Sequence, residues 1–393
     1  MSLKTMNSLQ TDGANKKYAK AAKKKSFLAD FAKYLVNNQI GDDFLLNCQT
    51  PSHYILHLGM NINIYWFTWL LDLPIRILAF LSLMYLIKFP GADKFFFLQH
   101  GDPKTGLYKK GRDDVCFVFT WVVLFTSLRA ATMKYLLSPI AKLCGIKKNT
   151  QRIRFAEQGW SFLYYSIFWT LGMYVMSKSP YWFDTTYFWK GYPHIEMSGL
   201  FKWYYLVQLA FWIQQVFVIN IEKRRKDFVE MVAHHAITIS LIYFSYLMNF
   251  TRIGNAVLCT MDFVDIILPF AKMLKYSGFN VVCDYVFGFF MLSWMVTRHY
   301  FFGRIIYSTW TEPQQLIEFK WAPDEEYYVT ENSLGFFLTL FLFLQAIIYF
   351  WFYLICRVAY RVIKGDNAHD NRSDSELEET EVNNNFANEM KKE

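Results

Sequence analysis

The sequence predicts an all-α membrane protein with about eight transmembrane helices. Hydrophobic residues make up 54% of the 393 positions and charged residues only 19%, against roughly 25% in an average soluble domain. The charges are crowded into the two ends of the chain and a few short loops, which leaves long apolar stretches between them. This distribution excludes an ordinary water-soluble, collagen-like or wholly disordered chain and favours a polytopic membrane protein.

Eight of these apolar stretches are long enough to cross a bilayer, which takes about 20 helical residues. The first is the weakest, because Asp72, Pro74 and Arg76 interrupt it. The fifth and sixth are joined only by residues 249–252, so we expect these two helices to be antiparallel neighbours. The expected spans are 62–88, 115–137, 159–177, 200–221, 229–248, 253–274, 281–302 and 335–362.

The loop charges predict the orientation of the chain. The loop 303–334 is acidic and falls on one side, and the basic loops fall on the other, at 142–154, 223–226, 272–275 and 357–364. Because basic loops stay in the cytosol, an even number of spans places both termini there. The loop 89–112 does not fit this orientation, since it carries five basic residues on the expected lumenal side. The number of spans before residue 115 is therefore left open.

The chain divides into four parts. We expect a basic cytosolic arm over 1–61, a first transmembrane segment with its loop over 62–114, a main transmembrane domain over 115–363, and a disordered acidic tail over 364–393. The net charge of +8 comes from Lys and Arg in the arm and beside apolar segments, which argues against nucleic-acid binding. The six cysteines form no CxxC pair and indicate neither a disulfide framework nor a zinc site.

A basic run followed by two histidines opens the fifth span. An ionisable group at the centre of a membrane helix costs about 2.5–3.5 kcal/mol, so it is a functional candidate. Glu230 and His234 share one helical face at i, i+4 spacing, and His235 points about 100° away. The two imidazoles therefore cannot both face lipid, although a hydrogen-bonded pair between helices would also explain them. The basic run consists of Arg224, Arg225 and Lys226.

Two aspartates lie on one face of the next span. Asp262 and Asp265 are at i, i+3 spacing, and without partners they would cost about 5–7 kcal/mol together. Counted from the short turn at 249–252, Asp265 and His235 lie at nearly the same depth, 13 and 14 residues away. The sequence thus predicts a cluster of histidines and aspartates inside the membrane.

A third polar group lies in the span 281–302, where Arg298 and His299 follow Trp294 by one turn. Arg298 has three interpretations: it pairs with a carboxylate, it binds substrate, or its head reaches back to the interface.

Three chemistries are open to the histidines and aspartates. A zinc site needs three or four ligands, and adjacent histidines rarely bind one ion. A proton relay would serve a transporter, but the sequence lacks the paired repeats that transporters often have. In acyl transfer, a neutral histidine takes a proton from the nucleophile or is itself acylated, and a carboxylate orients it. The basic run would then hold a phosphate-rich leaving group.

Several motifs resemble those of the longevity-assurance family, the TLC-domain ceramide synthases, most closely its fungal branch. A tail element, D-x-R-S-D-x-E at 370–376, follows the last span as in that family. The motifs inside the membrane region are R-K-D-F-x-E-M at 225–231, H-H-x-x-T at 234–238, S-Y-x-x-N at 245–249, M-D-x-x-D at 261–265, and Lys272. The resemblance covers roughly residues 115–380.

The resemblance implies an acyltransferase of the endoplasmic reticulum that joins a sphingoid base to the acyl group of a fatty acyl-CoA, giving ceramide and CoA. In fungi the bases are dihydrosphingosine and phytosphingosine, and the donors are very long. Acyl-CoA is a co-substrate, and neither a further cofactor nor a metal is implied. The implied fold is a six-helix barrel within 115–363 around an acyl tunnel. The implied partners are membrane lipids, a small single-span regulatory subunit and a second copy of the chain.

The family's essential residues correspond to His234, His235, Asp262 and Asp265. We expect His234 to be the base or a transient acyl-imidazole, and Asp262 to stabilise charge or hold the amine. Expected substrate-binding residues are Arg224, Arg225, Lys226, Glu230, Trp294 and Arg298. Ser373 and Ser375 each precede an acidic residue by three positions, as in kinase sites, so we expect a phosphoprotein. The alternative function is a non-catalytic TLC-type protein that binds lipid or assists its translocation.

Overall fold

The computed structural model describes residues 62–221 and 227–364. The arm 1–61, the run 222–226 and the tail 365–393 lie outside the described residues. The described part is mostly helical. Its α-helices are α4 (Ile62–Leu86), α5 (Asp114–Ala131), α6 (Ser138–Leu143), α7 (Asn149–Ser177), α8 (Gly199–Ile221), α9 (Phe228–Leu247), α10 (Thr251–Asp262), α11 (Val264–Tyr276), α12 (Asn280–Trp294), α13 (Phe302–Thr311), α14 (Pro313–Leu316) and α15 (Glu331–Ile363).

Other elements are short. Two π-helical turns, η2 (Thr132–Leu137) and η4 (Met295–Phe301), interrupt long helices, and three 3₁₀ turns lie in loops: η1 (Ala92–Phe95), η3 (Thr185–Phe188) and η5 (Pro323–Glu325). Strand β1 (Leu107–Tyr108) pairs antiparallel with β2 (Met197–Ser198), with Leu107 opposite Ser198. Strand β3 (Lys320–Ala322) pairs with β4 (Tyr327–Val329) in a hairpin, with Trp321 opposite Tyr328.

Within the described residues, five helical segments are long and apolar enough to cross a membrane: Asp114–Leu143, Gly199–Ile221, Phe228–Leu247, Asn280–Thr311 and Glu331–Arg361. The chain is therefore a multi-pass membrane protein, as predicted. The other three predicted spans are also helical, as α4, α7 and the pair α10–α11. Neither α10 nor α11 reaches 18 residues by itself, so the total of eight stays a prediction.

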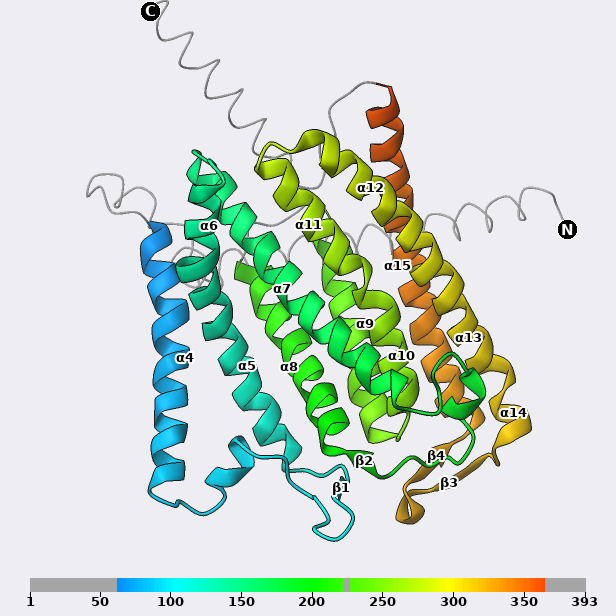
Figure 1. Ribbon diagram of the computed structural model, residues 1–393. Helices are drawn as coiled ribbons and strands as arrows, with labels where there is room; N and C mark the ends of the chain where they lie inside the picture. Colours follow the sequence, from blue (N-terminus) through cyan, green and yellow to red (C-terminus); the bar gives the residue numbers. More distant parts are fainter. Residues whose placement is uncertain (1–61, 222–226, 365–393) are drawn as a thin grey trace, which may run out of the picture. The chain divides into compact units, whose positions relative to one another are not determined.

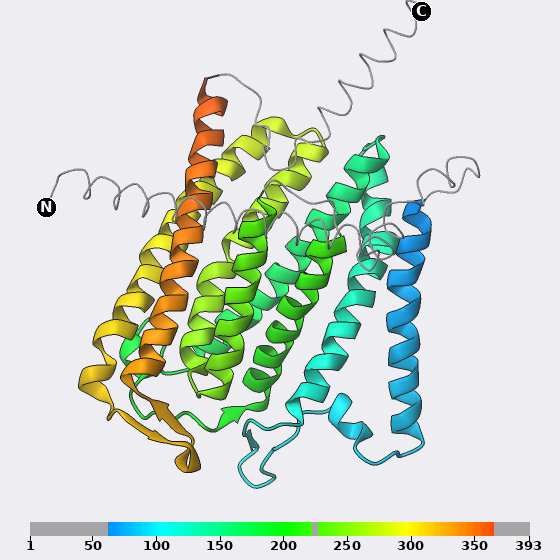
Figure 2. The ribbon, with the colours of Figure 1, turned by 180° about the vertical axis from the view of Figure 1, so that it is seen from behind.

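Six helical segments pack in a closed sequence of neighbours. Helix α7 packs against α8, α8 against α9, α9 against α15, α15 against α13, and α13 against α10, which continues as α11 back to α7. Figures 1 and 2 show these segments side by side, with the long α12–η4–α13 rod in yellow next to α15 in orange. Helix α5 lies outside this group and packs on α8. The group encloses the cavities described below.

Two ends of the helix group can be distinguished. At one end, here called the hairpin end, the loops 87–113, 178–198 and 312–330 meet the short turn between α9 and α10. At the other, the α8–α9 end, α8 finishes and α9 begins on either side of residues 222–226. The long helical segments alternate in direction between these ends, with α10–α11 and α12–η4–α13 each counted as one segment, as Figure 1 shows.

The basic loop 89–112, which did not fit the charge pattern, lies at the hairpin end, and two of its lysines pair with acidic side chains. Lys94 pairs with Asp113 at 2.8 Å, and Lys110 pairs with Glu326 of the hairpin at 3.2 Å. The hydrogen bond from Lys94 lowers the pKa of the Asp113 carboxyl below its usual range. The pair with Glu326 ties this loop to the hairpin, and the side of the membrane on which the loop lies stays a prediction.

Candidate active site

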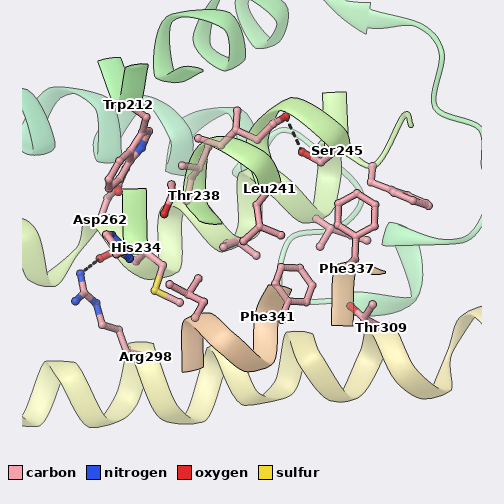
Figure 3. A pocket seen from close by; sticks show the side chains of 18 of the residues that line it. Trp212, His234, Thr238, Leu241, Ser245, Asp262, Arg298, Thr309, Phe337 and Phe341 are labelled. Carbon is pink, nitrogen blue, oxygen red and sulfur yellow. Dashed lines mark hydrogen bonds between the residues drawn. The ribbon is translucent and has the colours of Figure 1, made fainter. Parts of the chain in front are cut away.

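Two cavities lie inside the helix group, and they meet. The inner cavity contains about 730 Å³ of empty space and is walled mainly by apolar side chains of α8, α9, α10, α13 and α15. Figure 3 shows it from His234 to Phe337. The outer cavity contains about 1320 Å³ and reaches Ile219 and Phe228, at the α8–α9 end. Four residues border both cavities: Trp212, His234, Asp265 and Arg298.

His234 lies at this junction, seven residues into α9. Its ring stands edge-on to two indoles, Trp212 at 5.5 Å and Trp351 at 5.2 Å between ring centroids. Its Nδ1 atom is buried and has no hydrogen-bond partner among the described residues. A buried imidazole nitrogen without a partner is costly in a structural position, but it is available to a substrate.

His235 is buried beside it and borders only the outer cavity. Its Nδ1 lies 2.7 Å from the backbone carbonyl of Met231. A carbonyl only accepts, so Nδ1 carries the proton and donates it, which leaves Nε2 free to act as an acceptor. The helix backbone thus orients the His235 ring, whereas the Nδ1 atom of His234 has no such partner among the described residues.

Asp262 ends α10 and borders the inner cavity. Its Oδ2 accepts a hydrogen bond from the amide of Gln208 at 3.1 Å, and the Gln208 carbonyl accepts one from the hydroxyl of Tyr164. The other oxygen, Oδ1, is buried with no hydrogen-bond partner among the described residues. Sequence reasoning missed Gln208 and Tyr164, although a glutamine inside the apolar stretch 200–221 was a usable signal.

Asp265 pairs with Arg298 of η4 at 2.8 Å. Arg298 also donates to the Met261 carbonyl at 2.9 Å, and its guanidinium lies 4.2 Å from the centre of the Trp294 ring. Because Arg298 is buried, it does not reach back to an interface. Of the interpretations left open by the sequence, carboxylate pairing is therefore the one that the structure shows. Trp294 itself borders the outer cavity.

The wall of the outer cavity carries charged and polar groups. They come from α5, α7, α8 and α11, and they are Arg129, Glu157, Gln158, Gln215 and Lys272. Glu230 is half-buried in the first turn of α9 and borders neither cavity. The expected phosphate-binding residues Arg224, Arg225 and Lys226, and the tail serines Ser373 and Ser375, lie outside the described residues. Within the described part of the chain, no three His, Cys, Asp or Glu side chains are grouped to hold a metal ion.

Two histidines and two aspartates that line an apolar cavity and an adjoining polar one make a candidate catalytic site. Residues 154–357 match the sequence profile of the TLC domain. Fungal relatives match over most of their length. Sphingosine N-acyltransferase lag1 of Schizosaccharomyces pombe is 40% identical over 340 residues, which is 85% of this chain and 87% of the relative.

Two further relatives agree. Ceramide Synthase FUM18 of Gibberella moniliformis is 40% identical over 333 residues, covering 77% of this chain and 78% of the relative. Ceramide synthase LAG1 of Saccharomyces cerevisiae is 36% identical over 282 residues, covering 71% and 68%. The chain therefore belongs to the TLC-domain family of sphingosine N-acyltransferases, or ceramide synthases, and the resemblance drawn from its motifs is confirmed.

Proposed function

We propose that this protein is a ceramide synthase that transfers the acyl group of a fatty acyl-CoA to the amine of a sphingoid base, giving ceramide and free CoA. The observation that carries the proposal is the position of His234, at the junction of an apolar cavity and a polar one. An acyl-CoA has the same division, with a hydrocarbon chain on one side of its thioester and phosphates on the other. The thioester carbon would lie beside the imidazole.

The reaction needs a group that accepts a proton. The protonated amine of the base first releases one proton to solvent. Its nitrogen then attacks the thioester carbonyl and gives up a second N–H proton, the C–S bond breaks, and the CoA thiolate takes up that second proton. His234 is our candidate for the base that accepts and returns this proton. Attack of His234 itself on the thioester, followed by transfer from an acyl-imidazole to the amine, is the alternative route with the same residue.

The remaining polar residues have supporting roles in this proposal. The unpartnered Oδ1 of Asp262 is placed on the inner cavity to accept a hydrogen bond from the amine. Asp265 is held by Arg298 and also borders both cavities, so the pair fixes the polar junction. His235, with its acceptor Nε2, would orient groups on the outer side. We assign Glu230 no contact with the reacting atoms.

The outer cavity is our candidate site for the CoA moiety. Arg129 and Lys272 in its wall, together with Arg224, Arg225 and Lys226 beyond the end of α8, would meet the phosphates. This places the α8–α9 end in the cytosol, where acyl-CoA is supplied, with both termini on that side of the endoplasmic reticulum membrane. A single-span subunit, a homodimer and phosphorylation of Ser373 and Ser375 remain part of the proposal.

The test uses full-length protein purified in detergent, palmitoyl-CoA and dihydrosphingosine, with N-acylated product measured by mass spectrometry. We expect product from the wild type and a loss of at least a hundredfold in a His234→Ala, His235→Ala variant that elutes as folded protein. His299→Ala is the matched control, because His299 lies in the same membrane region but borders neither cavity. Lipid binding without turnover by the wild type would favour the non-catalytic alternative.

A further inference from the structure

Trp189 lines the inner cavity at the hairpin end, and its indole is here called the floor of that cavity. Trp189 follows η3 in the loop before α8, is fully buried, and borders the cavity. Its indole donates a hydrogen bond to the hydroxyl of Ser308 in α13 at 3.0 Å. The aromatic ring of a loop at the hairpin end thus reaches into the helix group and is held there from a helix on the cavity wall.

A polar network fixes the floor from behind. The Ser308 hydroxyl donates to one carboxylate oxygen of Glu312 at 2.7 Å. The other oxygen accepts from Thr185, one turn before Trp189, at 2.7 Å, and from Arg304 at 3.1 Å. The loop that carries Trp189 and the helix that holds its indole are therefore tied to the same carboxylate. A group held from both sides resists displacement by an entering chain.

Other aromatic rings pack around Trp189 at this end of the inner cavity. Phe250 packs edge-on to Trp189, with ring centroids 5.9 Å apart, and edge-on to Phe337 of α15 at 5.2 Å. Tyr192 stacks on the other side of Phe250 at 5.1 Å. Both Trp189 and Phe250 are at most 3% exposed. Rigid, interlocked aromatic side chains make a firm end wall, unlike flexible aliphatic ones.

The distance from His234 to this floor can be measured along the cavity walls. Ser245 borders the cavity eleven residues after His234 on α9, and Thr309 borders it eleven residues after Arg298. Ile253 borders it twelve residues before Asp265. At the helical rise of 1.5 Å per residue, these three walls give depths of about 16–18 Å, and α15 gives about 25 Å from Trp351, whose ring lies against His234, to Leu334.

That depth limits the chain that fits. With C–C bonds of about 1.5 Å and tetrahedral angles, an extended hydrocarbon advances about 1.25 Å per carbon. Depths of 16–25 Å then hold about 14–20 carbons. A 26-carbon chain, at about 31 Å, is longer than each of the four walls.

On the basis of the function proposed above, we propose that Trp189 determines the specificity for the donor, and that the donor is a long-chain acyl-CoA of about 14–20 carbons. The thioester end lies at His234, the chain runs between α9, α10 and α13, and its methyl end meets the indole. This departs from the very-long-chain donors that the family resemblance implied.

The test offers purified protein an equimolar mixture of saturated acyl-CoAs from 12 to 26 carbons with one sphingoid base, and reads the product distribution by mass spectrometry. We expect the wild type to favour donors of about 14–20 carbons by at least tenfold over 26. Trp189→Ala removes an obstacle about 5 Å long, so its maximum should move up by about four carbons. Trp189→Phe keeps a ring as floor and should move it by about two or fewer.

A second variant shortens the cavity from within. Leu241 borders it seven residues after His234, about 10 Å or eight carbons deep. Leu241→Trp should lower product from 16-carbon donors at least tenfold relative to eight-carbon donors, added here to the mixture. Leu247→Trp is the matched control, since Leu247 is on the same helix but exposed and borders neither cavity; its product distribution should equal that of the wild type.

The outcomes separate the two proposals. No product from a folded wild type with any donor would reject the proposed function. Product with a maximum above about 20 carbons in the wild type, or unchanged distributions in both Trp189→Ala and Leu241→Trp, would reject the floor while leaving the function standing. A parallel assay offers one acyl-CoA with a mixture of sphingoid bases of different lengths; a changed preference for the length of the base in these variants, with an unchanged donor preference, would assign the inner cavity to the other substrate and also reject the floor. If Trp189→Ala does not fold, Leu241→Trp decides.

Discussion

The contribution of the ion pair between Arg298 and Asp265 to stability can be tested directly by substitution. Both groups lie inside the helix group, 2.8 Å apart. Removal of one member of a buried ion pair costs about 3–5 kcal/mol, because the other charge stays buried without compensation. Arg298→Met keeps an unbranched apolar side chain in place of the guanidinium but leaves Asp265 alone. Because the Asp265 side chain is 28% exposed and borders both cavities, we expect a loss of stability at the lower end of this range, about 3 kcal/mol.

Removal of both charges should restore most of this stability. Apolar replacement of a whole buried pair is close to neutral, so Arg298→Met with Asp265→Leu should be markedly more stable than Arg298→Met alone. Activity should not return, because Asp265 and Arg298 both border the junction of the two cavities. If the double variant recovers stability but not turnover, the ion pair is needed for activity at the junction and not only for folding.

The control for this prediction lies in the same rod. Arg304 pairs with Glu312 at 3.1 Å, but its side chain is 47% exposed. Exposed pairs contribute about 0–1 kcal/mol, so Arg304→Met should change stability little. The assay is the midpoint of thermal unfolding in detergent, followed by size-exclusion chromatography. Equal losses for Arg298→Met and Arg304→Met, or a double variant no more stable than Arg298→Met, would refute the reasoning.

Two further predictions concern positions that the sequence did not single out. Gln208→Leu removes the donor to Asp262 and takes a partner from the buried hydroxyls of Tyr164 and Tyr204. The loss of about 1.5–3 kcal/mol should lower the melting temperature and also lower kcat about 10- to 100-fold. An unchanged kcat would exclude a positioning role. Burial lowers the pKa of His194, in the loop after Trp189, from 6.5 to about 4. Because the unfolded state then binds more protons between pH 6.5 and 4, stability should fall as the pH falls through this window, and the slope should be shallower in His194→Gln; parallel curves would contradict this.

The chemistry-bearing residues inside the membrane could be predicted from the sequence because the bilayer makes them expensive. The free-energy cost of inserting ionisable groups into a membrane was enough to select four residues, His234, His235, Asp262 and Asp265. The short turn at 249–252 then placed them at about the same depth. The structure brings His234 and both aspartates to the inner cavity and adds His235 to the outer one with Asp265. Their assignment as catalytic stays a prediction until the variants are measured.

Other features were hidden for different physical reasons. Trp189 is one of 13 tryptophans and lies in a loop, so composition gave no cause to select it. Its place as a floor depends on contacts with Ser308 and Phe250, which are far from it in the sequence. The partner of Arg298 could not be chosen among pairing, binding and reaching the interface, because only the packing of η4 against α10 decides between them.

The backbone itself explains why the polar residues gather at one level. The break between α10 and α11 falls at Phe263, between the two aspartates, and Pro269 has no N–H to donate to the Asp265 carbonyl. On the facing rod, the π-helical turn η4 carries Arg298, whose guanidinium donates to the Met261 carbonyl next to that break. Inside a membrane, irregular backbone is tolerated only where protein groups or a cavity satisfy it, and π turns recur at functional sites. The interrupted helix supplies the Met261 carbonyl and the Asp265 carboxylate, and the π turn supplies the Arg298 guanidinium that donates to both. Together they hold Asp262, Asp265 and Arg298 at the wall of the inner cavity.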